Sequence, residues 1–469
     1  MALLAICATP AWAQQSIQTA FNYNLADDTS AAPAAPAAPE KKDADSGDNK
    51  PSCGSETSSP SCGCEAPSCG CSSEPSCGCG SCGCGGCGCG DWCCCDLNNY
   101  WPFCCCCKPG DPWTLEKCLT PCCSDVTYGG YFEIGYHSQN TGLSANDGDG
   151  LDTNDYPGRV QLQQAYFEIG KKAKTDSCCC DWGYQFDAVY GTNGDTVQSF
   201  SNHNNDWDKP WDFGVYGWAI PQLYADLGWN NWEFKIGHFY TPVGYEVFPA
   251  TGNFFYSHSL SWNDSEPFTH TGVLGTYTPD QCWTYYAGWT LGWDSGFEQA
   301  GIANEGGHGD NAILGFTHKI SDNLTFSYLC TVGNFGPASG DEFGYEHTII
   351  ADAKLSDKWE YVIENDMVEA DGPFGQATNN REDFEIANYL FYTINDCWKA
   401  GLRAEWWRSN QVTGQDNSFY ELTGGVNYKY TANLIVRPEV RYDWSEGDLT
   451  NGQISYDRVE FGIDAIMTY

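Results

Sequence analysis

Basic residues are scarce in this chain. Its 469 residues include 22 Lys and Arg against 62 Asp and Glu, which gives a formal net charge of −40 at pH 7. Such a chain repels both nucleic acid and anionic lipid headgroups. We therefore expect no nucleic-acid partner and no electrostatic attraction to a lipid surface.

Long apolar runs are also absent. No stretch of about 18 consecutive apolar residues occurs, so these residues encode no transmembrane helix. Aromatic residues, in contrast, make up 15% of the chain, which is high for a soluble protein. A membrane protein of this composition would have to cross the bilayer as a closed β-barrel.

The first 13 residues have the composition of a secretory signal. An apolar stretch precedes Ala11-Trp12-Ala13, which matches the small-x-small pattern of a cleavage site. We predict a signal peptide at 1–13, with its true start further upstream because the usual basic residues are missing. The alternative is an ordinary apolar N-terminus. Export would place the cysteines in an oxidising compartment.

Three segments of different composition follow. Residues 14–52 contain AAPAAPAAPE and a mixed-charge polar run, which predicts an Ala/Pro-rich polar linker. Residues 53–125 form a cysteine-rich, low-complexity tract that holds 21 of the 28 cysteines, and we expect it to be a disordered extension. Residues 126–469 have a different pattern, in which short segments alternate between apolar and polar residues.

The alternation between 126 and 469 has the period of β-strands. Sixteen candidate strands lie at 126–137, 161–173, 182–192, 220–229, 231–241, 268–278, 283–294, 311–320, 323–334, 345–356, 359–370, 383–394, 398–410, 418–430, 433–445 and 456–469. Short turns such as Asn230-Asn231 alternate with long loops such as 242–267. This arrangement is typical of a bacterial outer-membrane barrel, with the turns on the periplasmic side.

The predicted fold class is therefore all-β, a transmembrane antiparallel up-and-down β-barrel of about 16 strands surrounded by outer-membrane lipid. A soluble β-sandwich or propeller would also alternate. Aromatic residues at the segment ends, such as Trp182, Trp229 and Trp359, favour the membrane barrel because amphipathic rings belong at its interfaces. The chain also ends with apolar residues at every second position, including Phe461 and Tyr469, a pattern that resembles an outer-membrane assembly signal.

The stretch from Gly237 to Tyr277 resembles the OmpL-like family of β-barrel porins. The matching positions are Thr241, Pro242, Gly244, Tyr245, Glu246, Asn253, Tyr256, Ser257, His258, Pro267, Phe268, Thr269 and His270. The resemblance extends from about Tyr128 to the C-terminus, and this stretch is its most specific part. It implies an outer-membrane pore for small solutes, and it implies no catalytic residues and nothing about the cysteine tract.

Charges near the predicted pore suggest how it could select solutes. The aromatic loop 242–267 is too apolar for open water, so we expect it to fold into the lumen and narrow it, with Glu246, Asp264 and Glu266 as its carboxylates. Candidate charges on the opposite wall are Lys399, Arg403, Glu405, Arg437, Glu439, Arg441, Arg458 and Glu460. Facing acidic and basic clusters would create a transverse field, whereas the alternative is a set of solvated, mutually paired wall charges. The net charge of −31 over the barrel region (48 acidic and 17 basic residues) favours cations.

These features predict a porin for passive diffusion of small polar solutes. One alternative is a structural envelope protein with a plugged barrel, and another is a carbohydrate-selective porin that uses the aromatic loop as a stacking platform. We expect no enzyme and no cofactor, because Ser257, His258, Asp264 and His270 form triplets that chance readily supplies. A homo-oligomer is an open possibility.

The cysteines suggest covalent links on the periplasmic side. Candidates for disulfides or for a metal of unknown identity are Cys77, Cys79, Cys82, Cys84, Cys87, Cys89, Cys178, Cys179, Cys180, Cys282 and Cys397. Adjacent thiols of a Cys-Gly-Cys unit point apart, so partners should be distant or on other envelope proteins. Thiolates also favour soft metal ions, and both interpretations stay open at this point.

Overall fold

The architecture is known from a computed structural model of the whole chain, which describes residues 109–116, 124–138, 156–176, 178–198, 208, 211–297, 310–335, 343–371, 380–410, 416–446 and 458–469. The predicted signal peptide, the linker and the cysteines between Cys77 and Cys89 lie outside the described residues. In the described part of the chain, no helix is long and apolar enough to cross a membrane.

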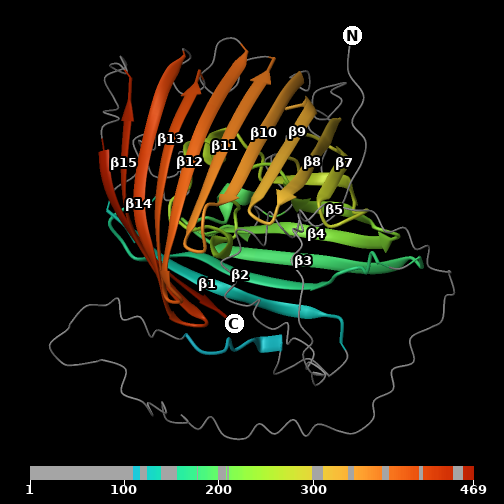
Figure 1. Cartoon of the computed structure of the whole chain (residues 1–469), viewed down its shortest axis with the longest axis horizontal. Helices are drawn as coiled ribbons and strands as arrows, with labels where there is room; N and C mark the ends of the chain where they lie inside the picture. The colour runs from blue at the N-terminus through green and yellow to red at the C-terminus, as the bar shows by residue number, and fades with distance from the viewer. Residues whose placement is uncertain are drawn as a thin grey trace, which may run out of the picture.

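Sixteen antiparallel strands make up the described fold and close into a barrel (Figure 1). They are β1 (Thr127–His137), β2 (Gln161–Lys171), β3 (Asp181–Gly191), β4 (Gly217–Trp229), β5 (Trp232–Tyr240), β6 (Thr269–Tyr277), β7 (Trp283–Thr290), β8 (Asn311–Ser321), β9 (Leu324–Asn334), β10 (Phe343–Lys354), β11 (Trp359–Ala370), β12 (Arg381–Asn395), β13 (Trp398–Ser409), β14 (Asn417–Thr431), β15 (Leu434–Ser445) and β16 (Arg458–Thr468). Each strand pairs with its neighbours in sequence, and β1 pairs with β16 to complete the ring. The predicted strand number and the all-β barrel class are confirmed.

The short hairpins have the backbone geometry that a tight turn needs. Asn230 and Asn231 connect β4 and β5 with φ values of 46° and 68°. Two successive positive φ angles define the turn whose twist matches paired strands, and asparagine tolerates them better than most residues. The end of the barrel that carries these short connections and the C-terminus is called the turn end.

Most predicted strand boundaries lie within two residues of the observed ones, and two differ by three or more. β4 begins at Gly217 instead of 220, because the register opposite Asp187 and Val189 is irregular and so accommodates Pro221, which lacks an N–H. β7 ends at Thr290 instead of 294, because the chain then turns inward and buries Trp293.

The barrel has an apolar outside and a polar inside. Ile134 on β1, Leu402 on β13 and Met467 on β16 expose nearly half of their surface on the outer side, whereas Glu133 and Arg403 are buried on the inner side. Exposure of many large apolar side chains on a closed barrel would be costly in water and is suited to hydrocarbon. The predicted period-two alternation is therefore confirmed.

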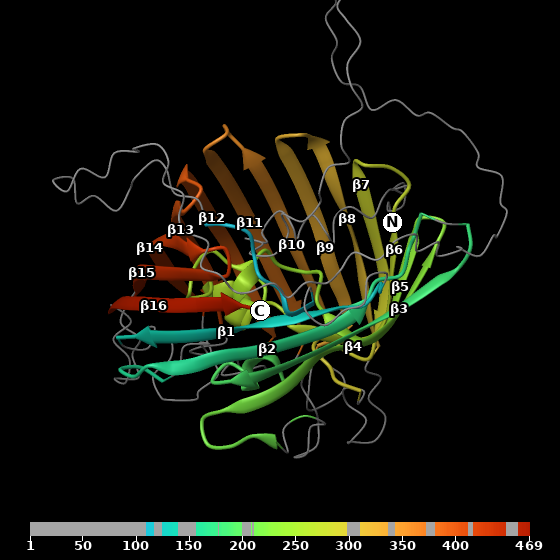
Figure 2. The ribbon, with the colours of Figure 1, turned by 90° about the horizontal axis from the view of Figure 1, so that it is seen from below.

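The connection between β5 and β6 folds into the barrel, and residues 241–268 are called the inward loop. It contains a short 3₁₀ turn, η3 (Ala250–Gly252), and one helical turn, α3 (Leu260–Asp264). Ser259 caps α3 because its Oγ accepts a hydrogen bond from the amide of Trp262 at 3.2 Å. Figure 2 places this yellow-green segment within the ring of strands.

Candidate functional site

Arg403 on β13 is the main anchor of the inward loop. Its Nη1 donates to Glu246 Oε1 at 2.6 Å and to the carbonyl of Ser257 at 2.9 Å. Its Nη2 donates to Ser257 Oγ and to the carbonyl of His258, both at 3.0 Å. Its Nε completes the set with Glu421 Oε2 at 3.0 Å, so the buried guanidinium binds the loop and the wall together.

Three further arginines bind backbone carbonyls of the loop. Arg437 Nη1 donates to Ala250 and Asn253 at 3.0 and 2.7 Å. Arg441 Nη1 donates to the carbonyl of His258 at 2.5 Å, and Arg381 Nη2 donates to the carbonyl of Asp264. These arginines also pair with wall carboxylates, namely Arg437 with Asp464 and Glu133, Arg441 with Asp443, and Arg381 with Asp383.

Carboxylates on the same side of the barrel hold the amide groups of the loop. Glu405 accepts from the amides of Leu260 and Ser261 at 2.7 and 2.9 Å. Glu439 accepts from the amides of Tyr256 and Ser257 at 2.8 and 3.0 Å. Arginines thus bind carbonyl groups of the loop and carboxyl groups bind its amides.

The charge state of Glu246 follows from its neighbours. Burial opposes its ionisation, but the Arg403 guanidinium and the hydrogen bond with His258 outweigh burial and lower the pKa of Glu246 to about 2. His258 Nδ1 lies 2.9 Å from Glu246 Oε2, and its ring stacks on Trp262 at a centroid distance of 3.7 Å. Burial lowers the pKa of His258, although Glu246 opposes this shift.

The sequence suggested that loop carboxylates and basic wall residues face each other across an open lumen, but at Glu246 and Arg403 there is no such gap. Glu246 and Arg403 are in direct contact, so these two charges neutralise each other and cannot supply a transverse field between them. The partners expected for the wall charges are also different. Lys399 pairs with Glu360 at 3.0 Å, and Glu460 lies 3.3 Å from His137. Arg458 opens β16 and is only partly buried.

Several family-motif residues give the inward loop its shape. Thr241 Oγ1 accepts from the amide of Val243 at 3.1 Å and lies 3.0 Å from His270 Nε2. Asn253 Oδ1 accepts from the amide of Val247 at 2.9 Å, and the amide and hydroxyl of Thr269 both donate to Asp294. These contacts explain the motif through the conformation of the inward loop, which its residues stabilise.

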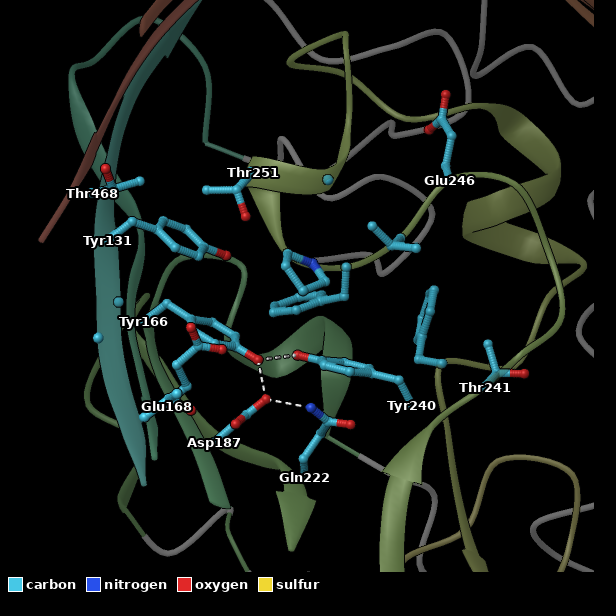
Figure 3. Close-up of a pocket in the computed structure, with 18 of the residues that line it drawn as sticks. Tyr131, Tyr166, Glu168, Asp187, Gln222, Tyr240, Thr241, Glu246, Thr251 and Thr468 are labelled. Carbon is cyan, nitrogen blue, oxygen red and sulfur yellow. Dashed lines mark hydrogen bonds between the residues drawn. The ribbon is translucent and has the colours of Figure 1, made fainter. Parts of the chain in front are cut away.

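Beside the inward loop lies a cavity of about 330 Å³ near the turn end. Its wall includes Tyr131, Tyr166, Asp187, Gln222 and Tyr240, and the loop contributes residues from Thr241 to Phe268. In Figure 3 the Tyr166 and Gln222 side chains converge on Asp187. Tyr166 donates to Asp187 Oδ2 at 2.5 Å, Gln222 donates to the same oxygen at 2.5 Å, and the hydroxyls of Tyr166 and Tyr240 lie 3.1 Å apart.

Two aromatic rings of the cavity wall are stacked. The ring centroids of Tyr131 and Tyr166 lie 5.0 Å apart, and the angle between the ring planes is 8°. Sequence reasoning missed these residues because each belongs to a different strand. Their inward positions in the alternation of β1 and β2 were the available signal.

The segment 109–116 lies at the mouth of this cavity. The amide of Trp113 donates to Asn433 Oδ1 at 2.7 Å, and Asn433 Nδ2 donates back to the carbonyl of Trp113 at 2.6 Å. The amide of Ala432 donates to the carbonyl of Pro109 at 2.9 Å. Chain that precedes the barrel is thus hydrogen-bonded to the β14–β15 turn and contributes Trp113 to the cavity wall.

The cysteines of the barrel take the expected positions. Cys178 to Cys180 precede β3, Cys282 precedes β7, and Cys397 precedes β13, so all of them lie at the turn end. Cys330 is buried within β9. At the C-terminus, Phe461 faces outward, and the hydroxyl of Tyr469 donates to the carbonyl of Tyr166 at 2.9 Å.

Comparison with known proteins assigns a family to this arrangement. The family model described as "Putative beta-barrel porin-2, OmpL-like" matches residues 125–469. No curated protein sequence matches the chain.

Among solved structures, the chain is similar to the anion-selective porin from Comamonas acidovorans, with 11% identity, a TM-score of 0.49 and coverage of 73% of this chain and 99% of that one. It is also similar to the outer-membrane channel DcaP of Acinetobacter baumannii, with 12% identity, a TM-score of 0.48 and coverage of 73% and 97%. A loop-deletion mutant of OmpT from Vibrio cholerae gives 12% identity, a TM-score of 0.47 and coverage of 73% and 99%.

Proposed function

Because this chain belongs to the OmpL-like β-barrel porin family and is an outer-membrane protein, we propose that it forms a water-filled channel for passive diffusion of small polar solutes. The observation that supports the proposal is the cavity that remains beside the inward loop. The loop is bound to β12, β13 and β15 through arginines and to β1 and β2 through Tyr131 and Gln164, and the cavity of about 330 Å³ lies between the loop and residues of β1 to β5. This geometry favours a narrowed passage along one wall.

The charges around the cavity support a preference for cations. Glu168 and Asp187 belong to its lining, whereas the arginines of the opposite wall are paired with carboxylates and loop carbonyls. A cation in the passage would therefore meet net negative charge.

The test is planar-bilayer recording of the purified protein in a salt gradient. We expect stepwise currents and a reversal potential that favours cations, with a smaller preference in E168Q. Currents without steps would refute the channel and favour the structural envelope protein with a plugged barrel. Steps with an anion preference would overturn the selectivity alone.

A carbohydrate-selective porin is the second candidate, and the stacked pair Tyr131–Tyr166 favours it. An aromatic face beside the hydrogen-bonding groups of Asp187 and Gln222 resembles the surroundings that sugar rings prefer in proteins. Liposome swelling with sugars and amino acids of matched size separates the two candidates. Equal rates for both classes would exclude the selective one, and faster sugar entry that Tyr131→Ala abolishes would establish it.

We also propose that the cysteine tract anchors or cross-links the barrel on the periplasmic side. Cys179 and Cys397 lie at the turn end, and Cys178 and Cys180 carry free, exposed thiols at the same end. Electrophoresis with and without reductant tests this. Bands larger than the monomer that disappear with reductant are expected for links to other envelope proteins, and a monomer that reductant leaves unchanged would contradict them.

A further inference from the structure

Three buried carboxylates meet where the inward loop ends. Glu266 belongs to the loop, and Glu364 and Asp366 project inward from β11. One carboxylate oxygen of each lies within 4.8 Å of those of the other two. All three side chains are at most 3% exposed, so water does not screen them from one another.

Most of these oxygens have no hydrogen-bond donor. In the described part of the chain, both oxygens of Glu266, both of Asp366 and Oε2 of Glu364 lack a partner. Both oxygens of the neighbouring Glu385 on β12, and Oε1 of Glu346 on β10, are in the same situation. Five buried acidic side chains therefore lie near one another, and eight of their carboxylate oxygens have no donor among the described residues.

The carboxylates that bind the loop near Arg403, Arg437 and Arg441 are different from this acidic group. There, every loop-binding carboxylate has a guanidinium or an amide as partner. Near the acidic group the described cation is Arg381, which is already paired with Asp383 at 2.7 Å and donates to the carbonyl of Asp264. An unpaired buried carboxylate is costly, so the group must be neutralised either by protons or by a bound cation.

The surrounding residues shape the site for close approach. Glu364 Oε1 accepts from the amide of Tyr245 at 2.6 Å, which brings the start of the loop to the place where Glu266 brings its end. Gly244 has φ of +89°, and a Cβ there would overlap with the Glu266 carboxylate. Glycine at this position thus tolerates the positive φ angle, and its lack of a Cβ leaves room for the Glu266 carboxylate.

We propose that Glu266, Glu364 and Asp366 bind a hard divalent cation, with Glu385 as an additional ligand. A donor set made only of carboxylate oxygens suits Ca²⁺ or Mg²⁺ and disfavours ions that prefer sulfur or imidazole. The cation joins both ends of the inward loop to β11 and β12, on the side of the lumen that lacks free arginines. This inference concerns cation binding and does not depend on whether the barrel conducts.

The primary test is calorimetric titration of Ca²⁺ into folded, detergent-solubilised protein that a chelator has stripped, in buffered salt that suppresses weak surface binding. We expect one saturable site per chain, weakened by about 10-fold or more in E266Q and in D366N. D322N removes an exposed carboxylate of the β8–β9 turn, outside the group, and should bind as the wild type does. A parallel Mg²⁺ titration shows which of the two ions the site prefers.

A second readout places the ion. Trp293 Nε1 donates to Glu346 Oε2 at 2.5 Å, so its indole adjoins the acidic group. Tb³⁺ substituted for Ca²⁺ should show emission sensitised by tryptophan, and W293F should lose much of that emission while it retains the Ca²⁺ stoichiometry.

Heat-dependent gel mobility shows whether each variant folds. The proposal can be refuted in either case. Wild-type protein that binds no Ca²⁺ or Mg²⁺, or that binds them with unchanged affinity in folded E266Q and D366N, overturns the proposal. The carboxylates would then be neutralised by protons alone. If neither variant folds, W293F decides: undiminished Tb³⁺ emission there places the ion elsewhere and overturns the proposal, and lost emission with retained Ca²⁺ stoichiometry supports it.

Discussion

Replacement of Arg403 by alanine should release the inward loop and destabilise the barrel. The substitution leaves the buried carboxylates of Glu246 and Glu421 without their shared cation. It also leaves the carbonyls of Ser257 and His258 without the donors that reach them at 2.9 and 3.0 Å. No water replaces these contacts at low cost, because Arg403 is fully buried.

The expected loss follows from the geometry. Removal of one partner of a buried ion pair lowers the free energy of unfolding by about 3–5 kcal/mol. R403A also loses the hydrogen bonds to the loop, so we expect a loss of at least this size. The matched control is R408A on the same strand, where Arg408 pairs with Asp416 at 2.8 Å but both side chains are about half exposed. An exposed pair contributes about 0–1 kcal/mol, so R408A should be nearly neutral.

The assay is urea unfolding of the lipid-reconstituted protein, followed by tryptophan fluorescence. A double-mutant cycle with E246Q should give a coupling free energy of about 1–3 kcal/mol. Single-channel recording should show larger and noisier currents in R403A, because the loop is no longer held at Ser257 and His258. The reasoning fails if R403A lies within about 1 kcal/mol of R408A, or if the cycle shows no coupling.

Three further predictions concern the loop and the cavity mouth. The pKa of Glu246 is lowered to about 2, so the stability that it contributes should persist above the unfolded value of about 4.3 and disappear as pH falls through about 2, and E246Q should flatten this part of an acid-unfolding curve. G244A should cost about 1–3 kcal/mol in urea unfolding because it adds strain at positive φ and displaces Glu266, whereas G158A, with φ of +75° and nothing within 4 Å, should cost only the smaller backbone term; equal losses would contradict the steric argument. W113A should raise single-channel conductance with little loss of stability, because the half-exposed ring lies at the cavity mouth while its backbone makes the anchoring hydrogen bonds; unchanged conductance would mean that the ring does not obstruct the passage.

The amino-acid sequence by itself determined the barrel. Period-two alternation is a local property, since successive side chains of a strand point to opposite faces. Leu402 and Arg403 therefore already have their outward and inward positions in the sequence, and the sixteen segments follow with boundary errors such as those at Pro221 and Trp293. The inward fold of residues 241–268 was also predictable, because their aromatic content is unsuited to open water.

Only the tertiary structure decided what the inward side chains meet. Glu246 and Arg403 are separated by 157 residues, and Tyr131 and Tyr166 come from different strands. The same is true of Glu266 and Asp366, whose proximity depends on where the loop lies in the lumen. The physical reason is that alternation fixes the face on which a side chain lies, whereas strand register and the path of a loop fix its neighbours. These depend on the closure of the whole ring, so no local pattern encodes them.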